Sequence, residues 1–295
     1  MFSSLIIAVL LAHLVYIEGA PVRDPSVNIQ SEVQGYLQEF GYMKPNDTAP
    51  IAPGSEVVSE ALKSFQQFAS LPVTGQADET TLKRMSAPRC GVTDAKMSSL
   101  QRFVLGGSKW NVRNITWAVS GYTKQLSESV VDAQIAKAWK VWSDNTNLTF
   151  SKSIKGQRPT IDILFAKGAH RDGSAFDGPR KVLAHATFPR AGTVHFDDDE
   201  TWVPSGKAER DGISLFIVAA HEFGHALGLD HSKVQTALMA PFYKYSPKDD
   251  IIDRDDIAGI QAMYGQPGAK SGVVNSRRDL PEDERIATTE KASAY

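Results

Sequence analysis

The sequence contains a single cysteine, Cys90, among 295 residues. One cysteine cannot form a disulfide within the chain, which excludes the small secreted proteins that depend on a disulfide framework. An excess of charge of one sign is also missing, because 32 Lys and Arg stand against 34 Asp and Glu and the net charge is −2. This balance gives no indication of nucleic acid or an anionic membrane as a partner.

A hydrophobic run of membrane-spanning length is not found at the N-terminus. The apolar run over residues 5–17 is broken only by His13 and is too short to cross a bilayer. We expect residues 1–20 to be a secretory signal peptide cleaved near Ala20, with a buried N-terminal helix as the alternative.

The remaining composition is that of an ordinary globular protein. Apolar residues make up 42% and charged residues 22% of the chain, and its length allows one or two domains with substantial cores. Three N-x-S/T triplets, at Asn46, Asn114 and Asn147, are compatible with glycosylation in the secretory route.

The most informative stretch begins at His221 and reads HEFGHALGLDH. His221 and His225 lie one helical turn apart, so both imidazoles leave one face about 6 Å apart and can meet one Zn²⁺. Glu222 is placed to take a proton from a metal-bound water. His231 can join them only if the chain turns back, and Gly228 accepts the positive φ that such a turn needs.

Three histidines with one open position are typical of a catalytic zinc site. The alternative is an amphipathic helix with histidines on its surface, and the glycine and third histidine at fixed offsets argue against it. Met239 lies at the distance expected of a Met-turn beneath the metal. The pattern resembles the metzincin class of zinc proteases.

Hydrophobic periodicity predicts the order of the elements. Near the N-terminus, helical spacing (including Ile29 on the apolar face) predicts short helices at residues 26–40 and 57–68, and Asp78 is able to cap a third over 78–85. Beyond residue 110, alternation and helical spacing predict strands at 114–120, 148–151 and 160–166 and helices at 127–142, 213–227 and 253–264. This order is typical of an α/β (α+β) domain, with a mixed sheet packed on helices, preceded by a small helical domain.

Cys90 lies in the segment PRCGVTD, at the end of the helical domain. A thiolate is a strong zinc ligand, and Cys90 in the open position of the site would keep the chain latent. Arg89 and Asp94 are able to pair and hold this loop. The alternative is a small buried cysteine next to a turn.

This segment resembles the cysteine switch of matrixins, the matrix metalloproteinases, whose usual form is P-R-C-G-x-P-D. Thr93 stands where the family has proline. Val73-Thr74-Gly75 and the FQQF run ending at Phe68 are also similar to the family's propeptide. The resemblance implies a metzincin catalytic domain with a twisted mixed sheet and three helices, preceded by a three-helix prodomain.

A second group of metal-ligating residues lies between the strands. Three histidines and a carboxylate suit a closed tetrahedral zinc site: His170, Asp172, His185 and His195. Acidic residues around them are of the kind that Ca²⁺ prefers, although an acidic run alone is usually a solvated loop.

The resemblance assigns these residues to the structural zinc and calcium sites of matrixins. It implies calcium-binding side chains from Asp177, Asp197 and Glu200, and carbonyls from Gly178, Arg180 and Val182. Arg171 replaces the family's common glycine, and two neighbouring stretches are shorter than usual. We therefore assign no additional calcium site.

Substrate binding is expected at a strand edge beside the zinc. An extended peptide should pair with the strand containing Leu183 and Ala184. Similarity to the family places Ile217 at the S1′ pocket, and Val218, Pro241 and Tyr243 suggest an apolar pocket for Leu- or Ile-like side chains. Each of these residues fits plain core equally well.

The chain is expected to divide into four parts: a signal peptide (1–20), a propeptide (21–98), a catalytic domain (99–265) and a disordered tail (266–295). Activation cleavage is expected within residues 93–104. The tail is too short for a haemopexin domain and lacks the apolar stretch of a GPI signal.

The leading interpretation is a secreted, latent zinc endopeptidase that hydrolyses extracellular matrix proteins, collagen among them, with two zinc ions and calcium as cofactors. Tissue-inhibitor proteins are the partners that the resemblance implies, and no membrane anchor is expected. Two alternatives stay open: a catalytically inactive relative acting as a binding module, and a structural zinc and calcium protein.

Overall fold

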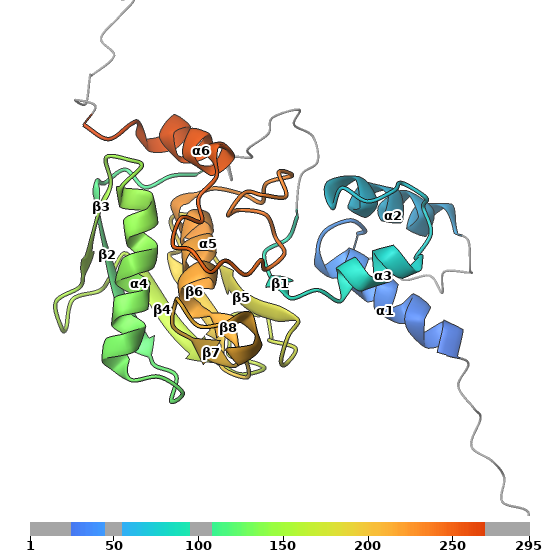
Figure 1. The fold of residues 1–295 in the computed structure, drawn as a ribbon, viewed down its shortest axis with the longest axis horizontal. Helices are drawn as coiled ribbons and strands as arrows, with labels where there is room; N and C mark the ends of the chain where they lie inside the picture. Colours follow the sequence, from blue (N-terminus) through green and yellow to red (C-terminus); the bar gives the residue numbers. More distant parts are fainter. Residues whose placement is uncertain (1–24, 45–54, 95–107, 269–295) are drawn as a thin grey trace, which may run out of the picture.

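The computed structural model describes residues 25–44, 55–94 and 108–268 (Figure 1). The predicted signal peptide, most of the predicted activation stretch and tail, and Asn46 lie outside the described residues. Within the described ranges, none of the helices has the length and apolarity needed to cross a membrane. We call residues 25–94 the N-terminal unit and residues 108–268 the C-terminal unit.

The N-terminal unit consists of three helices, as the periodicity predicts: α1 (Pro25–Glu39), α2 (Glu56–Phe68) and α3 (Glu79–Met85). Asp78 caps α3 by accepting the Thr81 amide, which satisfies a backbone donor that has no partner within the helix. Ile29 was expected on the buried face of α1, but it is 44% exposed, whereas Val33 and Leu37 further along the helix are buried.

The C-terminal unit is built on a mixed sheet. Its strands are β2 (Asn114–Gly121), β3 (Thr149–Lys152), β4 (Ile161–Ala166), β5 (Val182–Ala186) and β6 (Thr193–Asp197). With β1 (Arg89–Cys90) at the edge, the order is β1-β5-β6-β4-β2-β3. All neighbouring strands are parallel except β5 and β6, so the prediction of a mixed sheet is confirmed.

Two long helices, α4 (Glu128–Ser143) and α5 (Leu215–Leu227), lie side by side against the sheet, and α6 (Arg254–Tyr264) lies at one end (Figure 1). Trp139 of α4 stacks on Phe223 of α5 with ring centroids 3.6 Å apart, and on Phe150 of β3 at 4.5 Å. The apolar face predicted for α4 is confirmed. The stacked rings of Trp139, Phe223 and Phe150 hold α5 in position relative to the sheet.

The helix α5 begins two residues later than predicted. Residues 213 and 214 instead form β8 (Ile213–Ser214), which pairs with β7 (Trp202–Val203). A short 3-10 helix, η1 (Glu209–Asp211), connects the two strands. The Ser214 side chain then accepts the Ile217 amide as the N-cap of α5.

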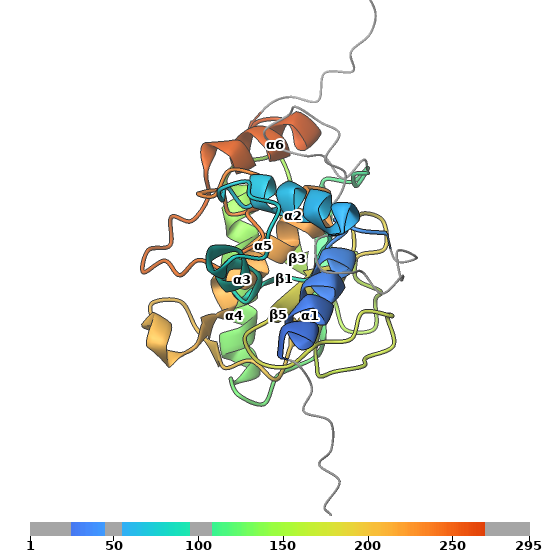
Figure 2. The ribbon, with the colours of Figure 1, turned by 90° about the vertical axis from the view of Figure 1, so that its right-hand side faces the viewer.

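A strand from the N-terminal unit completes the sheet. β1 pairs in parallel with β5, with Arg89 opposite Val182 and Cys90 opposite Ala184. In Figure 2, α1, α2 and α3 lie over this edge. The edge of β5 that was expected to receive a peptide is therefore covered by residues from the same chain.

Candidate active site

The end of α5 sets the geometry of the site. Gly228 has φ 110°, in the left-handed region, and the Leu229 amide donates to the Gly224 carbonyl oxygen at 2.9 Å. A Cβ at Gly228 would also overlap the carbonyl oxygen of Ser108. The chain turns back at this glycine, as predicted, and so returns His231 to the helix.

Four potential metal ligands meet at this point. The ligand atoms of Cys90, His221, His225 and His231 all lie within 4.8 Å of one another, and all four residues are buried. The Nε2 atoms of His221 and His225 are 3.2 Å apart. One sulfur and three nitrogens arranged in this way match the ligand types and number of a tetrahedral zinc site.

Backbone carbonyls fix the orientation of two of these imidazoles. Nδ1 of His221 lies 2.7 Å from the Leu238 carbonyl oxygen, and Nδ1 of His225 lies 2.7 Å from that of Leu229. Because a carbonyl oxygen only accepts, each Nδ1 carries the hydrogen and each Nε2 keeps its lone pair. Both rings therefore present an acceptor nitrogen to the cluster.

Glu222 lies between the two helix histidines and is fully buried. Neither of its carboxyl oxygens has a hydrogen-bond partner among the described residues. Burial raises the pKa of Glu222 to about 8. The pKa of the Cys90 thiol is raised above its ordinary value, mainly by burial and to a smaller extent by the nearby Glu222 carboxyl. The Val92 amide donates to the Cys90 sulfur at 3.3 Å.

The loop after His231 passes beneath α5. Asp256 accepts the amides of Leu238 at 2.7 Å and Met239 at 3.0 Å, which places the Met239 sulfur against Gly224. A side chain at Gly224 would overlap that sulfur, so this glycine of the motif is required for the close approach. The sequence indicated the methionine but not Asp256.

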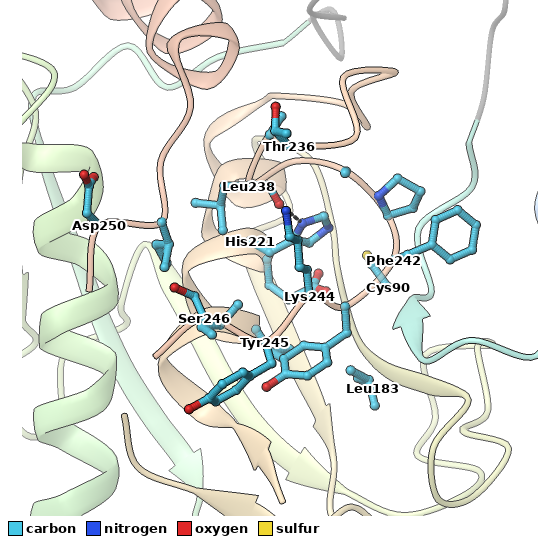
Figure 3. A pocket seen from close by; sticks show the side chains of 18 residues that line it. Cys90, Leu183, His221, Thr236, Leu238, Phe242, Lys244, Tyr245, Ser246 and Asp250 are labelled. Atoms are coloured by element: carbon cyan, nitrogen blue, oxygen red, sulfur yellow. Dashed lines mark hydrogen bonds between the residues drawn. The ribbon is translucent and has the colours of Figure 1, made fainter. Parts of the chain in front are cut away.

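A cavity of about 200 Å³ opens beside His221 and Glu222 (Figure 3). Of the residues expected to bind substrate, the cavity is lined by Leu183, Ile217, Val218, Pro241 and Tyr243. Further lining residues, which the sequence did not indicate, are Thr236, Lys244, Tyr245, Ser246, Asp250 and Ile251. Ala184 is not among the lining residues, and its carbonyl oxygen accepts the Gly91 amide at 2.8 Å.

The second group of ligands also comes together. His170, Asp172, His185 and His195 have ligand atoms within 4.8 Å of one another. Oδ2 of Asp172 lies 2.7 Å from Nε2 of His185 and 2.8 Å from Nδ1 of His195. Burial opposes ionisation of Asp172, but the Ser174 amide and these histidines outweigh it and hold the pKa below its usual value. Arg171, in place of the family's glycine, adopts φ 72°.

The acidic residues expected to bind calcium lie next to this cluster in the sequence. Asp197 and Glu200 are buried, and Oδ2 of Asp197 has no hydrogen-bond partner among the described residues. Burial raises the pKa of both carboxyls. Asp177 accepts the Val182 amide at 3.1 Å, and Glu200 accepts that of Arg180. Two buried carboxylates with an unpartnered oxygen fit a hard cation.

Comparison with known protein families identifies the fold. A family model described as Matrixin matches residues 109–265, more than half of the chain. The chain belongs to the matrixin family of zinc metalloendopeptidases. A second model, described as a peptidoglycan-binding domain, matches residues 30–85 of the N-terminal unit.

Individual relatives agree with this assignment. The chain is 40% identical to Matrix metalloproteinase-16 of Homo sapiens over 252 residues, and 44% identical to Interstitial collagenase of Oryctolagus cuniculus over 239 residues. These alignments cover 80% and 79% of this matrixin, but 41% and 49% of the two relatives. The chain thus spans about half, or less, of the length of these relatives.

In this matrixin, the predicted pair of Arg89 and Asp94 is confirmed and lies in an aromatic enclosure. The Arg89 guanidinium donates to the Tyr36 hydroxyl at 2.5 Å and lies 3.5 Å from the centre of the Phe40 ring. Tyr42 donates to Asp94 at 2.7 Å. The three aromatic residues were missed because nothing local in the sequence links α1 and the residues just after it to a segment some fifty residues away.

Proposed function

We propose that this matrixin is a latent zinc endopeptidase whose N-terminal unit closes the active site until it is removed. The observation that carries the proposal is the meeting of Cys90 with His221, His225 and His231 in one buried cluster. Cys90 comes from the N-terminal unit and the three histidines from the C-terminal unit. A purely structural zinc site has no need of a ligand from a separable segment.

The residues of the cluster fit zinc. Two imidazoles are held in the tautomer that leaves Nε2 free, and the thiol is the fourth donor. Zinc bound there supplies a Lewis acid that polarises a peptide carbonyl and makes water more acidic. Cys90 takes the position that water and substrate need, so the chain is inactive while Cys90 is in place.

Glu222 is the proposed general base. Its carboxyl takes a proton from the attacking water and returns it to the leaving amine. Its position supports this role, because the carboxyl is buried next to His221 and neither of its oxygens accepts a hydrogen bond among the described residues. Met239 and Gly224 have a structural role, since their contact supports the helix that carries His221 and His225.

The substrate is proposed to take the place of β1. An extended peptide pairs with the edge of β5 at Leu183 and Ala184, which β1 now occupies. One side chain of the peptide enters the cavity beside His221, whose inner walls include Ile217, Val218 and Tyr243. These walls favour an apolar residue such as leucine after the scissile bond.

The remaining metal sites are proposed to be structural. Zinc is held by His170, Asp172, His185 and His195, whose ligand atoms already lie together. Calcium is held by carboxylates, supported by the unpartnered Oδ2 of Asp197, and by the loop carbonyls. The proposed calcium ligands are Asp177, Gly178, Arg180, Val182, Asp197 and Glu200.

We propose the domain boundaries given above, with a propeptide over 21–98 and a catalytic domain over 99–265. The protein is proposed to be secreted and to act on extracellular matrix proteins such as collagen, because two of the relatives carry the name collagenase. Tissue-inhibitor proteins are the proposed regulatory partners.

The test is cleavage of a quenched peptide with leucine after the scissile bond, before and after treatment with an organomercurial or trypsin. Wild type, Glu222→Gln and Cys90→Ser are compared, each with and without a zinc chelator. We expect activity that appears on treatment, is lost in Glu222→Gln and is constitutive in Cys90→Ser. No cleavage by any variant while zinc is still bound would show a binding module instead.

A further inference from the structure

Phe242 belongs to the C-terminal unit, yet its side chain packs in the core of the N-terminal unit. It is 8% exposed, and its ring centre lies 6.4 Å from that of Phe65 in α2. Its partners in this core cluster all come from the N-terminal unit: Val33, Leu37, Met43, Ala61, Leu62, Phe65 and Ala69. In Figure 3 the ring of Phe242 points away from His221, although Phe242 is one of the residues that line the cavity.

Two arginines of the N-terminal unit enclose the same ring. The guanidinium carbon of Arg84 lies 4.8 Å from the ring centre of Phe242, and that of Arg89 lies 5.1 Å from it. Both distances are within the range of cation–π attraction. The ring therefore contributes electrostatic attraction as well as buried apolar area to this contact.

The backbone on both sides of Phe242 is tied to the segment that carries Cys90. The Cys90 amide donates to the Pro241 carbonyl oxygen at 2.9 Å, and the Tyr243 amide donates to that of Pro88 at 2.8 Å. These two bonds hold the backbone of Phe242 beside the N-terminal unit.

Contacts further from the metal cluster support this docking. Gln235 of the C-terminal unit donates to the Phe68 carbonyl oxygen at 3.2 Å. Phe40 of the N-terminal unit packs against Phe176 and Val182, where β5 begins. The two units thus meet through these contacts as well as at the metal cluster, where Cys90 joins the histidines and Asp94 of the N-terminal unit lies 2.9 Å from His231.

We propose that Phe242 anchors the N-terminal unit to the C-terminal unit independently of the metal. Cys90 closes the site, and Phe242 holds the unit that carries Cys90 in place. Displacing the thiol from the cluster then leaves the N-terminal unit docked, and its release requires Phe242 to leave the core around Phe65. The effect of Phe242 on latency rests on the proposed function, whereas its role in docking the two units does not.

The test uses the thiol of Cys90, which is the only one in the sequence. The rate at which iodoacetamide alkylates it in the full chain reports how often the buried segment opens. Wild type, Phe242→Ala and Phe150→Ala are compared in zinc and in excess chelator. Phe150 provides the matched control, because it packs on Trp139 within the C-terminal unit.

We expect Phe242→Ala to be alkylated at least about tenfold faster than wild type in both conditions, because the variant loses the buried ring. Phe150→Ala should stay within about twofold of wild type. Equal rates for Phe242→Ala and wild type would overturn the proposal. So would an equal increase in Phe150→Ala, or wild type in chelator reacting as fast as the denatured chain.

Arg84→Ala gives a second measurement from the other side of the contact, at a half-buried position. We expect it to increase the alkylation rate about two- to fivefold in wild type and to have no effect in Phe242→Ala, because its partner ring is gone. The same increase in both backgrounds would contradict the contact. The alkylation rates do not depend on peptidase activity, so they would still test the role of Phe242 if the proposed function were wrong.

Discussion

One carboxyl oxygen of Asp94 lies between Arg89 from its own segment and His231 from the metal cluster. This oxygen, Oδ1, is 2.5 Å from Nη2 of Arg89 and 2.9 Å from Nδ1 of His231. The Arg89 and Asp94 side chains are 2% and 0% exposed. Burial raises the pKa of Asp94, but the guanidinium and His231 outweigh it and hold the pKa at about 2. The carboxylate thus links the segment around Cys90 to a proposed zinc ligand.

Asp94→Asn is expected to destabilise the latent chain by about 3 kcal/mol, because it leaves the Arg89 charge buried without its counter-ion. The segment around Cys90 should loosen, so peptide cleavage should become measurable without an activator. Urea unfolding and a peptide assay check the two effects. Asp249→Asn is the matched control, because its pair with Lys137 is exposed and should be worth less than about 1 kcal/mol. Equal effects of the two substitutions would contradict the prediction.

Gly228→Ala is expected to prevent the turn that returns His231 to α5. The substitution places a Cβ in the left-handed region, which costs about 1–2 kcal/mol, and against the Ser108 carbonyl oxygen, which costs more. Gly206→Ala has only the backbone cost, because its φ is also positive but nothing lies within 4 Å of the added Cβ. The melting temperature and the zinc affinity should both fall clearly more in Gly228→Ala than in Gly206→Ala. Identical losses in both variants would show that the collision with Ser108 is unimportant.

The N-cap of α6 is expected to make stability depend on pH. The amide of Asp255, which donates to Asp253 at 3.0 Å, lowers the pKa of Asp253 below its ordinary 3.8. A carboxyl whose pKa is lower in the folded state contributes stability above its unfolded pKa and loses it as the pH falls through the folded value. Asp253→Ala should therefore cost about 1 kcal/mol at pH 7, and this cost should shrink below about pH 4.

Asp253→Asn serves as the control for this cap. The amide oxygen still accepts a backbone N–H but does not titrate, so its difference from Asp253→Ala should be independent of pH. The measurement is urea unfolding at a series of pH values from 7 to 3. A cost of Asp253→Ala that is constant over this range would show that the charge of the cap has no part in its effect.

His185→Ala is expected to remove one zinc ion and leave the other. Within the described residues there are two clusters of four potential ligands, and His185 belongs to the one that lacks Cys90. Elemental analysis should give about one zinc fewer per chain than in wild type, together with a lower melting temperature. Glu222→Ala, which removes no proposed ligand, should keep the wild-type zinc content. An unchanged zinc content in His185→Ala would exclude zinc at the second cluster.

Local patterns were sufficient to predict much of the fold. Local signals located the helices that became α1 to α6, with boundaries within two residues. These signals were apolar spacing, the cap at Asp78 and the histidine motif. The predicted turn at Gly228 is also local, since it depends on the conformational freedom of one residue. The residues of both potential metal clusters were likewise predicted from residue type and spacing.

Other features were decided only by the tertiary structure. Nothing in the sequence around Cys90 indicates that β1 joins the edge of β5, or that Phe242 packs against Phe65 across the two units. The polar lining of the cavity, such as Asp250, was missed for the same reason. Periodicity and spacing report only on neighbours within one element. Contacts between segments far apart in the sequence depend on how the helices and strands pack together. The sequence by itself determined which faces are apolar, but not which other element each face packs against.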